Sequence, residues 1–284
     1  MVEGVVTSTI RRVVRRSRSE FARARTERAD RRFNPRLAFH AEAPLVVLSP
    51  HPDDAVFNCW SVLTDGAPVR VVNVFAGVPT PGKVTWWDRI CGATESAAQM
   101  RARLAEDLAV LEPLVGAPVN LPLLEEQYRD RGRIPLAAID VRLVEAVGRA
   151  SAVYAPAALG AGHIDHRLAR ALARALVPHG MPVWLYADLP YAARHGWPHW
   201  VTNQPPDPHL DVDRYWEPAF AQVPEMGASR DARVVSLPAE AASRKLDAMR
   251  AYATQFRGMD WGGLLSDPHT HGHELYWRLR APSG

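Results

Sequence analysis

One histidine and two adjacent carboxylates directly follow a short apolar run. The run covers residues 45–48 and ends near a proline, and His51, Asp53 and Asp54 come next. Four to eight apolar residues bounded by chain breakers are typical of a buried strand. Neighbouring carboxylates repel each other, and burying them without a partner is costly. A bound cation would remove that cost.

A second polar group, His163, Asp165 and His166, lies between a predicted strand over 153–155 and a predicted helix over 165–176. In open α/β sheets, ligands bind just beyond the carboxyl ends of the strands. We therefore expect the two polar groups to meet at one edge of a sheet and to share a metal ion.

Three protein ligands with one open position are the arrangement of catalytic zinc. His51 and Asp54 are three residues apart and can reach one ion from a turn, and His166 would complete the set. The sequence favours Zn²⁺, with Fe²⁺ or another divalent ion as the alternative.

Three further residues are candidate catalytic groups. Asp53 would face the metal-bound water and accept its proton as general base. His163, with Asp165 as its orienting partner, would act on the substrate oxygen. The structural alternative for Asp53 and for Asp165 is a helix N-cap.

The elements that must position these residues alternate along the chain. Strands rich in apolar residues alternate with segments of helical periodicity, which indicates βαβ units and a mostly parallel sheet in an α/β fold. Residues 195–232 lack periodicity and are predicted to be an irregular insertion in a single domain. The predicted strands are 45–48, 69–75, 119–123, 153–155 and 183–187, and the predicted helices are 56–63, 94–115, 134–150, 165–176 and 240–256. The helix over 94–115 would bury Met100, Leu104, Leu108 and Leu111 on one face.

Composition is that of an ordinary globular protein. The 284 residues are 47% apolar and 23% charged, and the net charge is +3. No stretch approaches the roughly 20 apolar residues of a membrane span, and the start lacks the apolar region of a secretory signal. The two cysteines cannot form a disulfide framework. We expect a reduced, cytoplasmic location.

Residues 1–40 form a predicted basic helical arm. Eleven arginines lie between Arg11 and Arg36, against three acidic residues, and a thin apolar stripe accompanies them. A solvated or docked helix is the first interpretation, and a weak contact with a membrane surface or a protein is the alternative. No aromatic or groove-reading pattern accompanies the charge, so we expect no nucleic-acid partner.

The paired motifs resemble one known family. Pro50-His51-Pro52-Asp53-Asp54, together with the distant His163-x-Asp165-His166, is similar to the PIG-L / LmbE-like family of zinc-dependent N-acetylglucosaminyl deacetylases. The resemblance covers roughly residues 43–280, which sets a predicted deacetylase domain over 41–284. It implies a Rossmann-like α/β fold. It also implies zinc on His51, Asp54 and His166, with Asp53 as base and with His163 stabilising the oxyanion or protonating the leaving amine.

The resemblance further implies two substrate contacts. Arg103 begins an Arg-x-x-Glu pattern and would hold a substrate hydroxyl or phosphate, or else be a solvated helix charge. Asp188 follows the fifth predicted strand and would bind sugar hydroxyls, or else form a turn.

The chain also departs from the family pattern. Mycothiol-type members carry a tyrosine where this chain has Ala161. This argues against simple inositol sugars as substrates. It also removes one oxyanion donor, unless the loop near Trp86-Trp87 or the segment 195–232 supplies another. Five tryptophans would either stack on substrate groups or pack in surface loops: Trp86, Trp87, Trp197, Trp200 and Trp216.

The predicted function is removal of an acetyl or other acyl group from the nitrogen of an amino-sugar conjugate, in natural-product or glycoconjugate synthesis. The alternatives are an iron oxygenase with two histidines and one carboxylate, since His51-Pro52-Asp53 also fits that pattern, or a non-catalytic binding protein on the same fold. Oxygenases of that class usually have all-β jelly rolls, whereas the pattern here alternates.

Overall fold

The computed structural model of the chain describes residues 38–129, 136–159, 162–205, 208–223, 226 and 231–279. The predicted basic arm therefore lies outside the described residues except at its last few positions, and it stays a prediction. No described helix combines the length and the apolar character that crossing a membrane requires.

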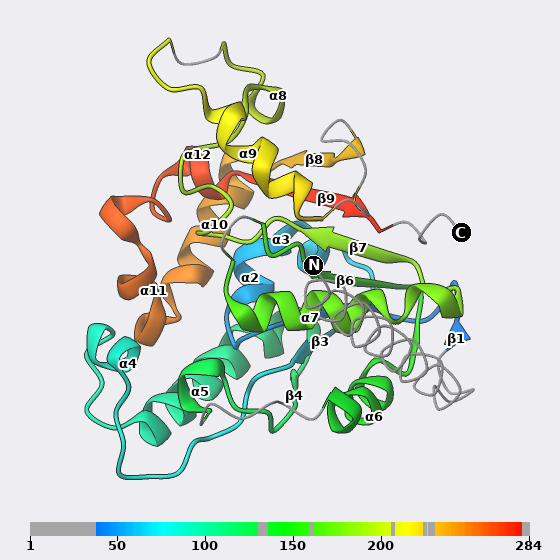
Figure 1. Cartoon of the computed structure of the whole chain (residues 1–284), viewed down its shortest axis with the longest axis vertical. Helices are drawn as coiled ribbons and strands as arrows, with labels where there is room; N and C mark the ends of the chain where they lie inside the picture. Colours follow the sequence, from blue (N-terminus) through cyan, green and yellow to red (C-terminus); the bar gives the residue numbers. More distant parts are fainter. Residues whose placement is uncertain are drawn as a thin grey trace, which may run out of the picture.

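The described residues form a seven-stranded sheet in the order β4-β3-β2-β6-β7-β9-β8 (Figure 1). The strands from β4 to β7 are parallel, whereas β9 is antiparallel to both β7 and β8. A separate short parallel pair joins β1 to β5. The mostly parallel α/β sheet of the prediction is confirmed. The strand bounds are β1 Ala38–Phe39, β2 Leu45–Ser49, β3 Val69–Asn73, β4 Val119–Asn120, β5 Arg149–Ala150, β6 Ala152–Pro156, β7 Val183–Tyr186, β8 Arg233–Ser236 and β9 His273–Arg278.

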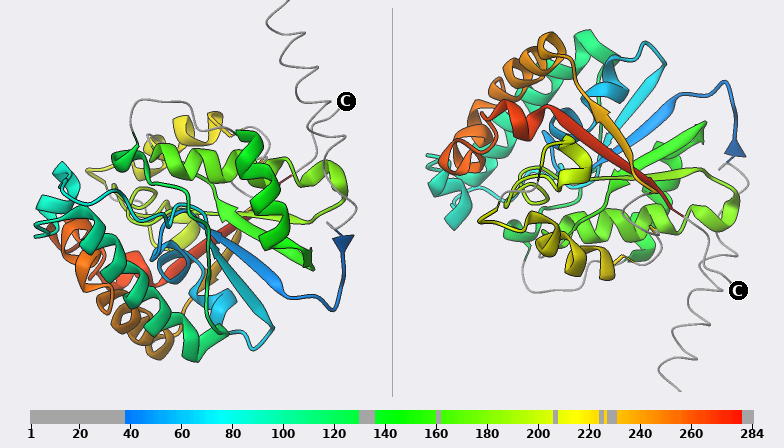
Figure 2. Two further views of the ribbon diagram at one scale, coloured as in Figure 1. Left: turned by 90° about the horizontal axis from the view of Figure 1, so that it is seen from below. Right: turned by 90° about the horizontal axis from the view of Figure 1, so that it is seen from above.

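Helices cover both faces of this sheet (Figure 2). Helices α6 and α7 lie on one face, and α5, α10 and α11 lie on the other. The helix bounds are α2 Asp54–Asn58, α3 Trp60–Thr64, α4 Trp86–Ile90, α5 Ser96–Val115, α6 Leu136–Val147, α7 Ile164–Arg174, α8 His199–Thr202, α9 Val212–Ala221, α10 Ala239–Arg250, α11 Ala253–Met259 and α12 Pro268–His271.

The central strands explain the apolar runs in the sequence. Val46, Val47 and Leu48 of β2 and Val153 of β6 are all fully buried. A parallel strand covered by helices on both faces has no polar side, so its sequence is a continuous apolar run. The strand order reverses between β2 and β6, because the chain continues from β2 to β3 on one side and from β6 to β7 on the other. Such a reversal opens a crevice at the carboxyl ends of the strands.

Several helices differ from the prediction. The expected helix over 56–63 is two short helices, α2 and α3, which meet at Cys59. Leu108, predicted on the apolar face of α5, is 40% exposed. The segment 195–232 is less irregular than predicted, since it contains α8 and the ten-residue α9, which continues past Pro218.

The antiparallel edge of the sheet was not predicted. Strand β9 carries the buried carboxylate of Glu274, which interrupts the apolar run that would mark a core strand. Lys245 of α10 donates to this carboxylate at 2.8 Å, and the backbone N–H of Trp60 donates to it at 2.7 Å. The carboxylate is therefore satisfied inside the protein by groups that are far away in sequence.

Candidate metal centre

The loop between β2 and α2 carries the first polar group at the carboxyl end of β2. Asp53 occupies the N-cap position of α2, but its side chain makes no capping hydrogen bond. Its φ of 153° is unusual for a residue with a side chain, and such strained residues often cluster at functional sites. The carboxylate of Asp53 therefore does not cap the helix, and it remains available for another contact.

The first turn of α7 carries the second polar group, at the carboxyl end of β6. His163 is the N-cap residue, and its Nδ1 accepts the backbone N–H of Asp165 at 3.2 Å. The N-cap alternative for Asp165 is therefore wrong, because the preceding histidine fills that position. Gly162 allows the tight approach, since a Cβ there would lie 3.0 Å from the backbone carbonyl carbon of Ala158.

The structure brings the three predicted metal ligands together. Oδ2 of Asp54 lies 3.2 Å from Nδ1 of His51 and 3.4 Å from Nε2 of His166. One ligand atom from each residue lies within 4.8 Å of the others. Asp54 and His166 are buried, and His51 is partly buried. Two imidazole nitrogens and one carboxylate oxygen thus face a common point.

Each of the two histidines holds a second carboxylate on its other nitrogen. Nε2 of His51 lies 3.2 Å from Oδ2 of Asp165, and Nδ1 of His166 lies 2.7 Å from Oδ1 of Asp188. Metal-binding histidines typically direct their second N–H to a carboxylate in this way, which fixes the tautomer and the ring orientation. The arrangement leaves Nδ1 of His51 and Nε2 of His166 for an ion.

In a second group of three residues, one possible ligand atom from each also lies within 4.8 Å of the others. This group contains His51, His163 and Asp165. The atoms of Asp165 and His163 that could bind an ion already accept hydrogen bonds, however. Oδ2 of Asp165 accepts the backbone N–H of Glu126 at 2.8 Å, and Nδ1 of His163 accepts a backbone N–H. The group that contains Asp54 is therefore the better candidate.

Two predicted roles differ from the observed contacts. Asp165 was expected to orient His163, but its carboxylate lies closer to Nε2 of His51, at 3.2 Å, than to Nδ1 of His163, at 3.7 Å. Asp188 was expected to bind sugar hydroxyls. It is 1% exposed, and its second oxygen accepts the backbone N–H of Ala158 at 2.6 Å, so both of its oxygens bond within the protein.

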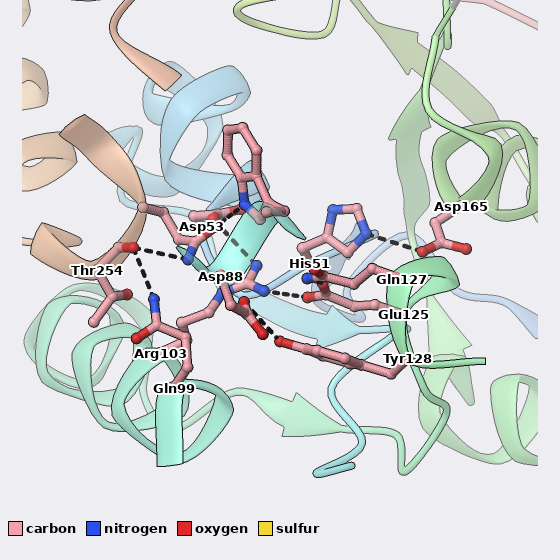
Figure 3. Close-up of polar contacts among 12 residues, drawn as sticks. His51, Asp53, Asp88, Gln99, Arg103, Glu125, Gln127, Tyr128, Asp165 and Thr254 are labelled. Atoms are coloured by element: carbon pink, nitrogen blue, oxygen red, sulfur yellow. Dashed lines mark hydrogen bonds and ion pairs between the residues drawn. The ribbon is translucent and has the colours of Figure 1, made fainter. Parts of the chain in front are cut away.

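Arg103 lies beside the catalytic candidate, not on the solvated face of α5 (Figure 3). The residue is 2% exposed, so the alternative of a solvated helix charge is wrong. Its Nη2 lies 3.5 Å from Oδ2 of Asp53, and its Nη1 donates to Glu125. Its Nε is buried without a partner among the described residues. The guanidinium therefore holds the carboxylate of Asp53 from one side.

The environment separates the two adjacent carboxylates. Burial, and next the charge of Asp54, raises the pKa of Asp53 to about 8. Burial also acts on Asp54, but the nearby His166 and the hydrogen bond with His51 outweigh it and lower its pKa to about 2. Burial and the neighbouring His51 lower the pKa of His163 to about 3. With Nδ1 accepting a hydrogen bond, the neutral ring of His163 carries its proton on Nε2 and can donate it.

The five tryptophans divide into two sets. Trp197 and Trp216 are buried and pack against each other with ring centroids 5.5 Å apart, so they are core residues. Trp200 is half-buried beside them. Trp87 donates its Nε1–H to Gln255 at 2.9 Å, whereas Trp86 is 74% exposed.

Two residues near the site were not predicted. Nη2 of Arg129 donates to Oδ1 of Asp165 at 2.6 Å. The ring of Tyr191 lies edge-on to that of His166, with centroids 5.6 Å apart. The sequence offers no signal for Arg129. Tyr191 follows Asp188 by three residues, so it belongs to the same stretch beyond β7.

Known proteins are similar to this chain in sequence and in fold. Residues 46–177 match the family described as PIG-L, GlcNAc-PI de-N-acetylase. The 2'-N-acetylparomamine deacetylase of Streptomyces fradiae is 32% identical over 166 residues, which are 52% of this chain. The match spans only 58% of that relative. The resemblance to the PIG-L / LmbE-like family is thereby confirmed.

Solved structures extend the similarity over most of the chain. A triple mutant of a deacetylase from the teicoplanin biosynthetic pathway is 29% identical, with a TM-score of 0.62, and the match covers 85% of this chain and 100% of that one. A structure described as the zinc-inhibited form of teicoplanin deacetylase is 26% identical, with a TM-score of 0.57 and the same coverage. The A40926 pseudoaglycone deacetylase, 24% identical with a TM-score of 0.58 over 86% of this chain and 99% of its own, shares the fold.

Proposed function

We propose that this chain, which carries a PIG-L domain, is a metal-dependent hydrolase that removes the acetyl group from the nitrogen of an N-acetylated amino-sugar conjugate. The observation that carries the proposal is the convergence of His51, Asp54 and His166 beside the carboxylate of Asp53. The relatives named above are deacetylases of antibiotic-related compounds, which supports a substrate of that kind.

The donor set fits a divalent ion. Two imidazole nitrogens and one carboxylate oxygen match a catalytic zinc site with an open position, and they also suit Fe²⁺. His51, Asp54 and His166 would hold the ion. When bound, it polarises the acetyl carbonyl and makes a coordinated water acidic near neutral pH.

The residues around this site then have separate tasks. Asp53 accepts a proton from the attacking water, and Arg103, at 3.5 Å, keeps its carboxylate in place. The water oxygen bonds to the acetyl carbon, and the Nε2–H of His163 donates to the oxygen on which negative charge develops. The carbon–nitrogen bond breaks after the nitrogen receives a proton from Asp53. The products are acetate and the free amine.

The two alternative functions have less support. Iron oxygenases of the class considered usually have all-β jelly rolls, whereas the sheet here is mostly parallel with helices on both faces. Turnover that needs neither oxygen nor a keto acid would exclude it. A non-catalytic binding protein would have no need for the intact ligand set, and turnover itself would exclude that function.

The direct test is amine release from N-acetylated sugars. The panel contains N-acetylglucosamine, an aryl glycoside of it, an N-acetylated aminocyclitol glycoside and a glycopeptide, with fluorescamine as the readout and acetate measured in parallel. Metal is added from below one equivalent, because a related structure is described as zinc-inhibited. We expect equal amounts of amine and acetate from at least one conjugate. No release from any of them, with metal bound, would refute the proposal.

A further inference from the structure

Tyr191 lies at the candidate metal centre without an assigned task. It follows β7, and its ring stands edge-on to His166, with centroids 5.6 Å apart and planes at 81°. Its other neighbour is Trp261, at 6.0 Å and 71°. The ring is therefore fixed between a candidate metal ligand and the partly exposed Trp261.

The hydroxyl of Tyr191 has no hydrogen-bond partner among the described residues. Other tyrosines in the core do have partners: Tyr186 donates to the carbonyl of Leu48 at 2.9 Å, and Tyr252 donates to Asp107 at 2.8 Å. The Tyr191 oxygen is not fully buried, so solvent or a ligand can reach it. A phenol O–H is both donor and acceptor, and this one is free to donate to a bound molecule.

The hydroxyl of Tyr191 is a protonated donor at neutral pH, as a tyrosine phenol ordinarily is. Burial, and next the carboxylates of Asp54 and Asp53, raises the pKa of Tyr191. The edge-on ring contact with His166 places the phenol at the same site as the candidate metal ligands. A protonated donor near the reacting atoms is what a developing oxyanion requires.

Building on the proposed function, we propose that Tyr191 is a catalytic residue whose O–H donates a hydrogen bond to the acetyl oxygen as that oxygen becomes negative. His163 Nε2–H is the second donor. The sequence points to the loop near Trp86-Trp87 or to 195–232 as a possible source of a replacement donor, and Tyr191 lies in neither segment. No bond to Tyr191 forms or breaks, and its proton stays on the phenol.

The test variant is Tyr191→Phe, which removes one oxygen and keeps both ring contacts. Loss of one oxyanion donor typically lowers kcat by about 10²–10³-fold. We expect that loss with KM, metal content and melting temperature close to those of the wild type. Tyr215→Phe is the matched control, since Tyr215 is 51% exposed and stacks on His195 in the insertion. It should behave as wild type.

A second measurement does not depend on turnover. The probe is glucosamine carrying a methylphosphonamidate in place of the acetamide, a tetrahedral anion that mimics the charged oxygen. Calorimetry should show a loss of affinity in Tyr191→Phe similar to the loss in kcat, with unchanged affinity for glucosamine itself. Equal affinity of the two proteins for the probe would overturn the proposal.

Other outcomes would also overturn it. A raised KM with unchanged kcat would mean that Tyr191 binds a sugar hydroxyl, and a loss of metal would mean that it positions His166. A wild-type protein that releases no amine would refute the proposed function alone, because probe binding would still report on Tyr191.

Discussion

Adjacent Asp53 and Asp54 differ in what surrounds them. Asp54 accepts the backbone N–H of His51 at 2.9 Å and lies between two imidazoles, which favours its ionised form. Asp53 has a different environment, where burial raises its pKa and the guanidinium of Arg103 lies 3.5 Å from its carboxylate. Environments that separate the pKa values of paired carboxylates typically separate their roles. The ligand and the base are therefore assigned by contacts and not by residue type.

Replacing each group should separate binding from chemistry. Asp53→Asn should retain the metal and lose about 10²–10⁴-fold in kcat, the usual contribution of a general base. His166→Ala should lose both metal and turnover. Metal analysis of the purified variants, with kcat measured in parallel, makes the comparison. An Asp53→Asn protein with wild-type kcat would eliminate Asp53 as the base.

At the scale of elements, the loop that follows β4 supports the centre from outside. Arg129 donates to Asp165 at 2.6 Å and to the carbonyl of Leu124 at 2.8 Å, and its guanidinium lies 5.3 Å from the ring centroid of Phe75. Asp165 in turn holds Nε2 of His51. The orientation of a metal ligand after β2 thus depends on a loop after β4 and on the first turn of α7.

Removing the Arg129 contact should weaken metal binding without removing a ligand. Loss of a group that directly holds a metal-binding histidine, as Asp165 holds His51, typically costs about 10–100-fold in metal affinity. Because Arg129 acts on His51 only through Asp165, we expect Arg129→Gln to show a loss at the lower end of that range, about 10-fold, in competition with a fluorescent chelator. Arg101→Gln is the control, since the side chain of Arg101 is 59% exposed and lies 3.9 Å from Glu95. Equal metal affinity of the two variants would show that Arg129 does not act through Asp165.

A second element contact joins α10 to β9. Lys245 and Glu274 are 0% and 2% exposed, and their charged groups are 2.8 Å apart. Breaking a buried pair leaves one charge uncompensated and costs roughly 3–5 kcal/mol. Lys245→Met should lower the free energy of unfolding by about that amount in urea titrations. The neighbouring Arg244→Gln, which breaks an exposed pair with Glu240, should change it by less than about 1 kcal/mol. Equal stability of both variants would contradict the buried-pair account.

Across the whole molecule, the sequence predicts those strands and site residues that are marked by short local patterns, and it does not predict contacts between distant segments. The parallel strands β2, β3, β6 and β7 are apolar runs, and the metal candidates follow two of them directly. Strands β8 and β9 pair antiparallel, and β9 contains the buried carboxylate of Glu274, whose partner Lys245 lies on α10. The carboxylate behind His51 is 114 residues away, at Asp165, and depends on loop geometry that no short pattern encodes.

Metal removal should be visible in the stability of the whole chain. An ion that binds only the folded state stabilises it by about 2.7 kcal/mol when its concentration is 100 times its Kd. Adding a chelator should therefore lower the melting temperature, and one equivalent of metal should restore it. His166→Ala should melt at the same temperature with and without metal. A wild-type melting temperature that does not depend on metal would contradict a site formed by the fold.

The most direct test of the metal centre is an anomalous difference map from crystals of the metal-loaded protein, recorded at the absorption edge of the bound metal. We predict one strong peak in contact with Nδ1 of His51, the carboxylate of Asp54 and Nε2 of His166. A peak on His163 and Asp165 instead, or a fully active protein with no peak among these residues, would contradict the account.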